Sequence, residues 1–368
     1  MTRTVLLHGM HRSPNFGDVL LTQILIDHLR KVSPELALRL LAPTDDVSNL
    51  LGVRSAAKTE ILFADVLLLG GGGFFQRMDG PSGSLKAIVK YALPLFLARL
   101  VGKRTAVIGA GVDRMPRGWM DKLVSILVNG SDTIAVRDQR GFDYMRKIVA
   151  RPQRESVYRV SDMVFAVDRN WLSDDALCWA DNLRSSLETE RVIAVHLSEP
   201  PSRNEKYETI VKILVAELAQ HPDTGVLLLQ DHPSRQNEQA KAQSELLARL
   251  PSRHIRALPY ESVERMAAVL ATSDAVLTSK LHVALCAAAM ETPPFAIAKH
   301  RKNLASFADI GRSEYCCNIF EASENEIERI VKEFVGAQGR FTVPAEVRER
   351  ANFALALAAN SATGHSGG

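Results

Sequence analysis

The sequence places an amide, a glycine and an acid together near its start. Asn15, Gly17 and Asp18 stand directly before a helical pattern that covers residues 19–31. Asn and Asp are good helix N-caps, which would account for Asn15 or Asp18 alone. Capping accounts less well for the combination Asn-x-Gly-Asp, so all three residues are candidates for a functional site.

Glycine runs form a second candidate group. Four consecutive glycines, 70–73, follow an apolar run, and such glycines let a backbone approach a ligand and direct several N–H groups at an anion. Gly71 and Gly72 are therefore candidate binding residues, and a tight turn without a ligand is the simpler explanation. The dinucleotide pattern G-x-G-x-x-G fails at Phe75 in this run and at Arg114 in a second one, which disfavours a nicotinamide or flavin enzyme.

Basic side chains form the third and fourth groups. Arg137 ends an apolar strand pattern, where an arginine can grip a phosphate or carboxylate with two hydrogen bonds. Lys280 and His282 begin a small, apolar helix after a polar turn that contains Ser279, and the free N–H groups and dipole there also favour an anion. Lys302 lies in a further basic loop. Solvated charge is the simpler explanation for a lone cation.

The elements that must position these residues follow an alternating pattern. Short apolar strands separated by helices predict an α/β protein with parallel sheets covered on both faces. Function gathers at the carboxyl ends of such strands, which is where the candidate groups fall. Expected strands are 5–8, 38–41, 66–69, 105–108, 133–136, 157–160, 192–197, 226–229, 275–277 and 294–297. Expected helices lie near 19–31, 84–101, 117–128, 139–149, 173–187, 205–220, 236–249, 261–272 and 280–290.

The length of 368 residues and a polar break near the middle predict two Rossmann-like domains. The first covers residues 1–168 and holds Asp18, the glycine loops and Arg137. A linker helix covers 169–190, and the second domain covers 191–342. The helix 343–358 is a candidate to return to the first domain, and the small, polar end 359–368 is expected to be disordered.

Composition excludes several classes of protein. The 45 Lys and Arg residues nearly balance 42 Asp and Glu, which argues against binding to nucleic acid by bulk charge. Four cysteines without a C-x-x-C pair indicate reduced thiols in a cytoplasmic protein. The histidines, cysteines and acids do not show the spacing typical of metal ligands. No signal-peptide pattern opens the chain. The longest apolar stretch, 87–101, is too short to span a membrane; a buried helix is the main interpretation and a peripheral membrane contact the minority one.

Six short motifs then occur in one order along the chain. Each is weak alone, whereas six in series are fairly specific, and the series resembles the polysaccharide pyruvyltransferase family over about residues 5–310. The motifs are Asn15-x-Gly17-Asp18, Leu69-Gly70-Gly71-Gly72, Ile108-Gly-Ala-Gly-Val112, Val136-Arg137-Asp138, Ser161-Asp162 and Ser279-Lys280-Leu281-His282.

The resemblance implies a GT-B-like fold, two Rossmann-like domains facing across a cleft. It also implies a transferase of exopolysaccharide or cell-envelope synthesis that works without a cofactor. Phosphoenolpyruvate would be the donor and a saccharide or lipid-linked saccharide the acceptor, and the product would be a pyruvate ketal. The resemblance maps the catalytic and donor-binding positions of the family onto Asp18, Arg137, His282 and Lys302, with the first domain on the acceptor side and the second on the donor side. The chemistry of ketal formation then makes His282 the candidate acid and Asp18 the candidate base. Arg137, Lys302 and Lys280, which replaces the usual Arg, would hold the donor.

Two alternatives stay open. A GT-B glycosyltransferase that uses a nucleotide sugar shares the expected fold, so architecture alone does not separate it from a pyruvyltransferase. Asp231 or Glu261 could serve its ribose in the second domain. The other alternative is a catalytically silent carbohydrate-binding relative, which Lys280 favours and which the retained Asp18 and His282 oppose.

Overall fold

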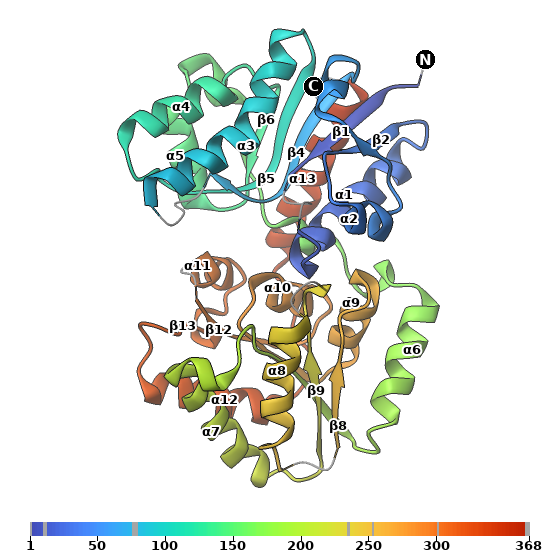
Figure 1. Ribbon diagram of the computed structural model, residues 1–368, viewed down its shortest axis with the longest axis vertical. Coiled ribbons are helices and arrows are strands. Elements are labelled where there is room, and N and C mark those ends of the chain that lie inside the picture. Colours follow the sequence, from blue (N-terminus) through green and yellow to red (C-terminus); the bar gives the residue numbers. More distant parts are fainter. Residues whose placement is uncertain are drawn as a thin grey trace. The chain divides into compact units, whose positions relative to one another are not determined.

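The chain divides into two compact units. The computed structural model describes residues 2–9, 13–75, 80–233, 236–251, 254–299 and 302–364. The first unit comprises Met1–Pro14, Asp18–Ala166 and Glu346–Gly368, and the second comprises Asn15–Gly17 and Val167–Ala345. Each unit has its own sheet, and every strand pair in both sheets is parallel (Figure 1). The predicted α/β class with two Rossmann-like domains is therefore confirmed.

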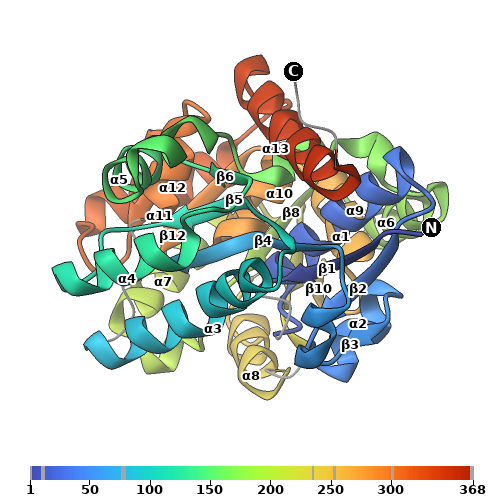
Figure 2. The same cartoon turned by 90° about the horizontal axis from the view of Figure 1, so that it is seen from above.

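The first unit contains a seven-stranded sheet with the order β3-β2-β1-β4-β5-β6-β7. Six of these positions repeat the order 3-2-1-4-5-6 of a Rossmann fold. The strands are β1 (Thr4–His8), β2 (Ala37–Leu41), β3 (Ser55–Ala56), β4 (Val66–Phe75), β5 (Arg104–Val112), β6 (Thr133–Val136) and β7 (Val157–Arg159). The helices are α1 (Phe16–Val32), α2 (Asp45–Leu51), α3 (Gly80–Leu100), α4 (Gly118–Val128), α5 (Gln139–Ile148) and α13 (Ala345–Thr363). Helices α3 and α13 lie on opposite sides of the sheet (Figure 2).

The second unit contains a six-stranded sheet with the order β10-β9-β8-β11-β12-β13, again that of a Rossmann fold. Side chains of three of its helices, α7, α8 and α12, share one buried core with the central strands. The strands are β8 (Arg191–His196), β9 (Thr224–Leu229), β10 (Ile255–Leu258), β11 (Ala275–Thr278), β12 (Pro294–Ala298) and β13 (Cys316–Asn318). The helices are α6 (Asp174–Ser185), α7 (Glu205–Ala219), α8 (Gln236–Leu247), α9 (Val263–Thr272), α10 (Leu281–Ala289), α11 (Lys302–Asp309) and α12 (Glu324–Gly336).

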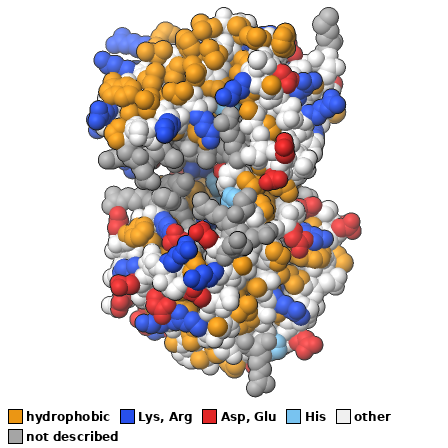
Figure 3. Space-filling view, in the orientation of Figure 1, with side chains coloured by type: hydrophobic (Ala, Val, Ile, Leu, Met, Phe, Trp, Pro, Cys, Tyr) orange, Lys and Arg blue, Asp and Glu red, His pale blue; other side chains and the backbone are white. Residues whose placement is uncertain are grey.

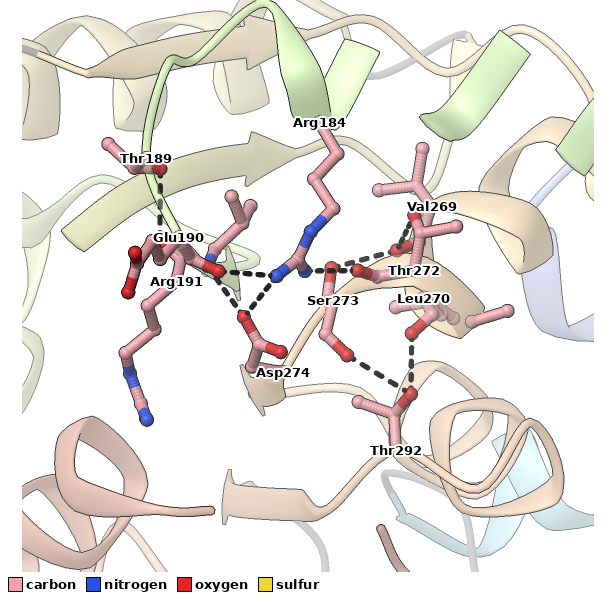
Figure 4. Close-up of polar contacts among 12 residues, drawn as sticks. Arg184, Thr189, Glu190, Arg191, Val269, Leu270, Thr272, Ser273, Asp274 and Thr292 are labelled. Atoms are coloured by element: carbon pink, nitrogen blue, oxygen red, sulfur yellow. Dashed lines mark hydrogen bonds and ion pairs between the residues drawn. The ribbon is translucent and has the colours of Figure 1, made fainter. Parts of the chain in front are cut away.

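The helix predicted between the two halves is α6, and it belongs to the second unit. Arg184 ties it there (Figure 4), because its guanidinium donates to the backbone oxygens of Thr272 and Glu190 and to Asp274 Oδ2 at 2.9 Å. The same Asp274 oxygen accepts the backbone N–H of Val192 in β8 at 2.7 Å. One arginine and one carboxylate therefore connect α6 to the sheet.

The end of the chain differs from its prediction. Helix α13 runs to Thr363, so residues 359–363 are helical rather than disordered, and residues 365–368 lie outside the described part. The helix returns to the first unit, where Ala362 accepts a hydrogen bond from Arg3 and Tyr158 packs against Phe353. The prediction was based on the small, polar composition of this segment. Its alanines, however, favour helix and pack as a buried stripe.

Three buried thiols of the second unit predict a loss of stability at alkaline pH. Burial raises the pKa of Cys286 and Cys316, and it raises that of Cys317, with the charge of Glu326, to about 12. A thiol whose pKa is raised by folding contributes its full stabilisation of the folded state below the unfolded-state pKa of about 8.5. That contribution is lost progressively as pH rises above this value. We expect each thiol to remove up to about 1.4 kcal/mol per pH unit above pH 9. Urea unfolding between pH 8 and 10 measures this, and Cys286→Ala should flatten the slope by one thiol's share; an unchanged slope would contradict the account.

Candidate functional site

Three neighbouring strands of the second unit end in polar side chains that meet. His196 ends β8, Asp231 follows β9 and Thr278 ends β11. His196 Nε2 lies 3.3 Å from Asp231 Oδ1, and His196 Nδ1 lies 3.2 Å from Thr278 Oγ1. All three side chains are buried. They lie where the strand order reverses between β8 and β11, which is where open α/β sheets bind ligands.

Lys280 joins this cluster from the start of α10. Its Nζ lies 3.2 Å from Asp231 Oδ2, and its backbone N–H donates to Thr278 Oγ1 at 3.0 Å. Gln239 Nε2 donates to Asp231 Oδ1, and the Asp231 backbone N–H donates to Gln239 Oε1 at 3.1 Å. The cluster therefore surrounds one carboxylate with a histidine, a lysine and an amide.

The neighbours of Asp231 decide its charge. Burial alone would raise the pKa of this carboxyl, but the charge and hydrogen bond of His196, the charge of Lys280 and the Gln239 amide together hold the pKa well below its usual range. Asp231 is therefore a carboxylate at neutral pH. It fixes the positions of His196 and Lys280 at the ligand-binding edge of the sheet.

His282 follows Lys280 in the first turn of α10, and Gly17 packs directly against its ring. A Cβ on Gly17 would fall 2.4 Å from His282 Nδ1, so a side chain here would displace the ring. The neighbouring Phe16 donates its backbone N–H to the Asp231 carbonyl oxygen at 2.8 Å. The glycine of the Asn-x-Gly-Asp motif is thus required by a close approach to a candidate catalytic histidine.

Three further predicted residues of the second unit have less defined surroundings. Ser279 is buried, and its Oγ accepts the backbone N–H of Ser198 at 3.0 Å, which ties the ends of β8 and β11 together. Asn15 directly precedes α1 and is half-buried. Lys302 is the first residue of α11, and its side chain lies outside the described part.

Arg137 and Asp162 form a buried ion pair in the first unit. Arg137 follows β6, and its Nη1 donates to Asp162 Oδ2 at 2.8 Å, with both side chains 6% exposed. Asp162 Oδ1 also accepts the backbone N–H of Val164 at 3.2 Å. Arg137 thus has a structural partner, and its guanidinium carries further N–H donors besides the one that Asp162 accepts. Asp18, in the first turn of α1, belongs to the same unit and is 7% exposed.

The glycine run lies inside a strand, not in a loop after it. β4 continues through the glycines to Phe75, where Gly70 and Gly72 pair with Ile108 and Ala110 of β5. Gly71 has φ +66°, and a Cβ there would meet the Leu21 side chain at 2.8 Å. The prediction of a glycine loop is wrong because β5 carries glycines of its own and the two backbones stay paired. Whether Gly71 and Gly72 bind substrate stays a prediction.

The structure thus gathers Asn15, Gly17, Ser279, Lys280 and His282 in the second unit and leaves Asp18, Gly71, Gly72 and Arg137 in the first. Sequence reasoning missed His196 and Gln239, and it considered Asp231 only as a ribose ligand. A signal for His196 was available. A histidine that ends an apolar strand falls at the same sheet edge as the other candidates.

Comparison with known proteins defines the class. The model of the polysaccharide pyruvyl transferase family matches residues 15–301. No curated protein sequence matches the chain. Among solved structures, UDP-N-acetylglucosamine 2-epimerase from Rickettsia bellii is similar with TM-score 0.61 and 11% identity over 99% of this chain and 97% of that one. The enzyme from Methanocaldococcus jannaschii is similar with TM-score 0.60 and 12% identity, over 96% of this chain and 99% of that one. The enzyme from Neisseria meningitidis, solved with UDP-GlcNAc, is similar with TM-score 0.57 and 11% identity, over 95% of this chain and 98% of that one.

The structural likeness, at such low identity, shows the fold: the chain is a GT-B-like α/β protein. The family match covers most of the chain. The protein belongs to the polysaccharide pyruvyl transferase family, and hence to the transferases of polysaccharide biosynthesis.

Proposed function

We propose that the protein transfers a pyruvyl group from phosphoenolpyruvate to two hydroxyls of a saccharide, forms a pyruvate ketal and releases phosphate in the cytoplasm. Membership of the family supports this reaction. The observation that carries it is the cluster of His196, Asp231 and Lys280 next to His282, at the ligand-binding edge of the second sheet. A donor with a phosphate and a carboxylate needs cations held in fixed positions, and Asp231 holds the Lys280 cation in place in this cluster.

Ketal formation requires three proton movements. One acceptor hydroxyl loses a proton as it attacks the enol carbon, and the methylene carbon gains a proton to become a methyl group. The second hydroxyl displaces phosphate, and its proton leaves with the phosphate. We assign His282 as the acid that protonates the methylene carbon and Asp18 as the base that accepts the hydroxyl proton. Arg137, Lys280 and Lys302 hold phosphoenolpyruvate. No cofactor is needed.

The fit of Gly17 against His282 gives a test of this assignment. Gly17→Ala places a Cβ 2.4 Å from His282 Nδ1, so the ring must move. We expect turnover to fall by about 10- to 100-fold, since small displacements of a catalytic group are costly. Steady-state kinetics measure this. Gly336→Ala is the matched control in the same unit, because nothing lies within 4 Å of a Cβ at that position. Equal turnover in both variants would remove His282 from the mechanism.

A matched pair of variants separates the two roles of Arg137. Arg137→Ala leaves the buried Asp162 carboxylate without its ion pair and should cost about 3–5 kcal/mol in unfolding free energy. Arg137→Lys keeps a cation but loses the planar fork, so phosphoenolpyruvate should bind at least about tenfold more weakly to a folded protein. Calorimetric titration measures the affinity. Wild-type affinity in the lysine variant would leave Arg137 a structural role alone.

The nucleotide-sugar glycosyltransferase is the second candidate, because the Neisseria neighbour was solved with UDP-GlcNAc. The two acids that could bind its ribose are engaged here: Asp231 by His196 and Lys280, and Glu261 by Arg265. The cavity beside Tyr260 and Glu261 holds about 20 Å³, room for about one water rather than a nucleobase. These contacts and the small cavity argue against a ribose bound by either acid.

A ligand panel decides between the two donors. Phosphoenolpyruvate at 100 times its dissociation constant should stabilise the protein by about 2.7 kcal/mol in a thermal unfolding experiment, whereas UDP-sugars should not. Stabilisation by a UDP-sugar alone would favour the glycosyltransferase. Stabilisation by neither donor, but by a saccharide, would favour the silent carbohydrate-binding relative.

A further inference from the structure

Helices α3 and α4 of the first unit expose apolar side chains to solvent. The most exposed are Leu100 and Ile126, at 66% and 58%. We call the set the α3/α4 face. It consists of Val89, Leu97, Leu100, Val101, Trp119 and Ile126.

The pattern along α3 makes this face unusual for a surface helix. Ile88, Ala92 and Leu95 point into the buried core of the unit, whereas Val89, Leu97 and Leu100 lie on the outer side. A surface helix normally pairs an apolar inner face with a polar outer face. Here both sides of the C-terminal half are apolar, so the outer side is suited to a partner that covers apolar groups.

Charge around the face is mainly positive. Residues 80–130 contain eight Lys and Arg but two Asp, whereas cations and acids nearly balance over the whole chain, at 45 and 42. Lys86, Lys122 and Arg117 are exposed and form no ion pair with any described residue. Asp121 is half-buried, and Tyr144 donates to its carboxylate at 2.6 Å. The face therefore presents apolar groups among unpaired cations.

The space-filling view shows the same gathering of apolar and basic side chains. Figure 3 shows hydrophobic side chains gathered over the α3 and α4 region of the first unit, with basic side chains along the border. In the described part of the chain, no helix has the length and apolar character that a bilayer crossing requires. Helices α3 and α4 could therefore rest on a membrane surface through this face, without crossing the bilayer.

We propose that the α3/α4 face docks on the surface of an anionic lipid bilayer. Apolar side chains with a tryptophan enter the headgroup boundary, and surrounding Lys and Arg bind anionic lipids. A second copy of this chain fits less well, because a symmetric contact would bring the cations of two identical faces together. Docking would bring the proposed saccharide acceptor to the enzyme if that acceptor is lipid-linked, a consequence that rests on the proposed function.

Vesicle sedimentation tests the docking and requires no activity, so its failure is distinct from failure of the proposed reaction. The full chain should bind vesicles that contain phosphatidylglycerol, less at high salt, and bind phosphatidylcholine vesicles weakly. The double variant Leu100→Glu and Ile126→Glu should lower binding to anionic vesicles at least about tenfold. Phe320→Glu, an equally exposed apolar side chain of the second unit, should leave it unchanged.

A second pair of variants tests the cations without changing an apolar group. The double variant Lys86→Gln and Lys122→Gln should weaken vesicle binding by about fivefold for each charge removed. One Lys or Arg near an anionic surface raises the membrane affinity by about this factor. Lys31→Gln with Lys212→Gln removes the same charge from exposed sites on α1 and α7 and should have little effect. No binding to anionic vesicles, or equal losses in both pairs, would overturn the proposal. So would self-association that the Leu100 variant abolishes without any vesicle binding.

Discussion

Asp231→Ala is expected to lower the free energy of unfolding of the second unit by about 3–5 kcal/mol. The variant removes the carboxylate that contacts His196 at 3.3 Å and Lys280 at 3.2 Å, and leaves the fully buried His196 without its charged partner. Urea unfolding monitored by circular dichroism measures the loss. Asp223→Ala is the matched control, since Asp223 is exposed in the same unit and should change stability by less than about 0.5 kcal/mol.

The stabilisation by Asp231 is expected to depend on pH in the acidic range. The folded-state pKa of Asp231 lies below its unfolded value of about 3.9. Its contribution is therefore complete above about pH 3.9 and is lost as pH falls through the folded-state pKa. The difference between wild type and Asp231→Asn should be full at neutral pH and shrink below about pH 4. A constant difference, or an Asp231→Ala variant as stable as Asp223→Ala, would contradict the buried cluster.

His282→Gln is expected to leave donor affinity nearly intact and to lower turnover by about 100-fold or more. A general acid in the transition state contributes about 100- to 10,000-fold to turnover. The phosphate and carboxylate of the donor are assigned to Arg137, Lys280 and Lys302, so loss of the imidazole should lower turnover rather than donor affinity.

The kinetic design separates chemistry from binding. Steady-state kinetics with phosphoenolpyruvate should show a large fall in kcat for His282→Gln, and the wild-type pH profile should be bell-shaped. Asp18→Asn should show a similar fall. His221→Gln, an exposed histidine of the same unit, should behave as wild type. Near-normal turnover of His282→Gln would defeat the assignment of the acid.

Much of the fold was predictable because the central strands are apolar throughout and set off by helices. All ten predicted strands occur, with boundaries that shift by up to six residues, the largest shift being at the end of β4. The strands that were missed, β3, β10 and β13, are edge strands of two to four residues. Only one side of an edge strand is paired, so it need not be apolar, and β10 is partly exposed along its length.

The site was predictable only in part. A polar residue at a strand end can be read from the sequence, as Lys280, His282 and Arg137 were. The contact between His196 and Asp231 depends on β8 and β9 being neighbours, which is a property of the strand order. The requirement for glycine at position 17 depends on a ring 265 residues later in the chain, at His282. Sequence spacing could not reveal either contact.

Transfer of label from phosphoenolpyruvate to a saccharide tests the central claim most directly. Carbon-labelled phosphoenolpyruvate is incubated with the protein and a panel of saccharide and lipid-linked saccharide acceptors. Labelled ketal and released phosphate are then measured together. The account predicts labelled acceptor and phosphate in equal amounts, with both reduced about 100-fold or more in His282→Gln. Transfer of a sugar from a nucleotide donor, with phosphoenolpyruvate left intact, would contradict it.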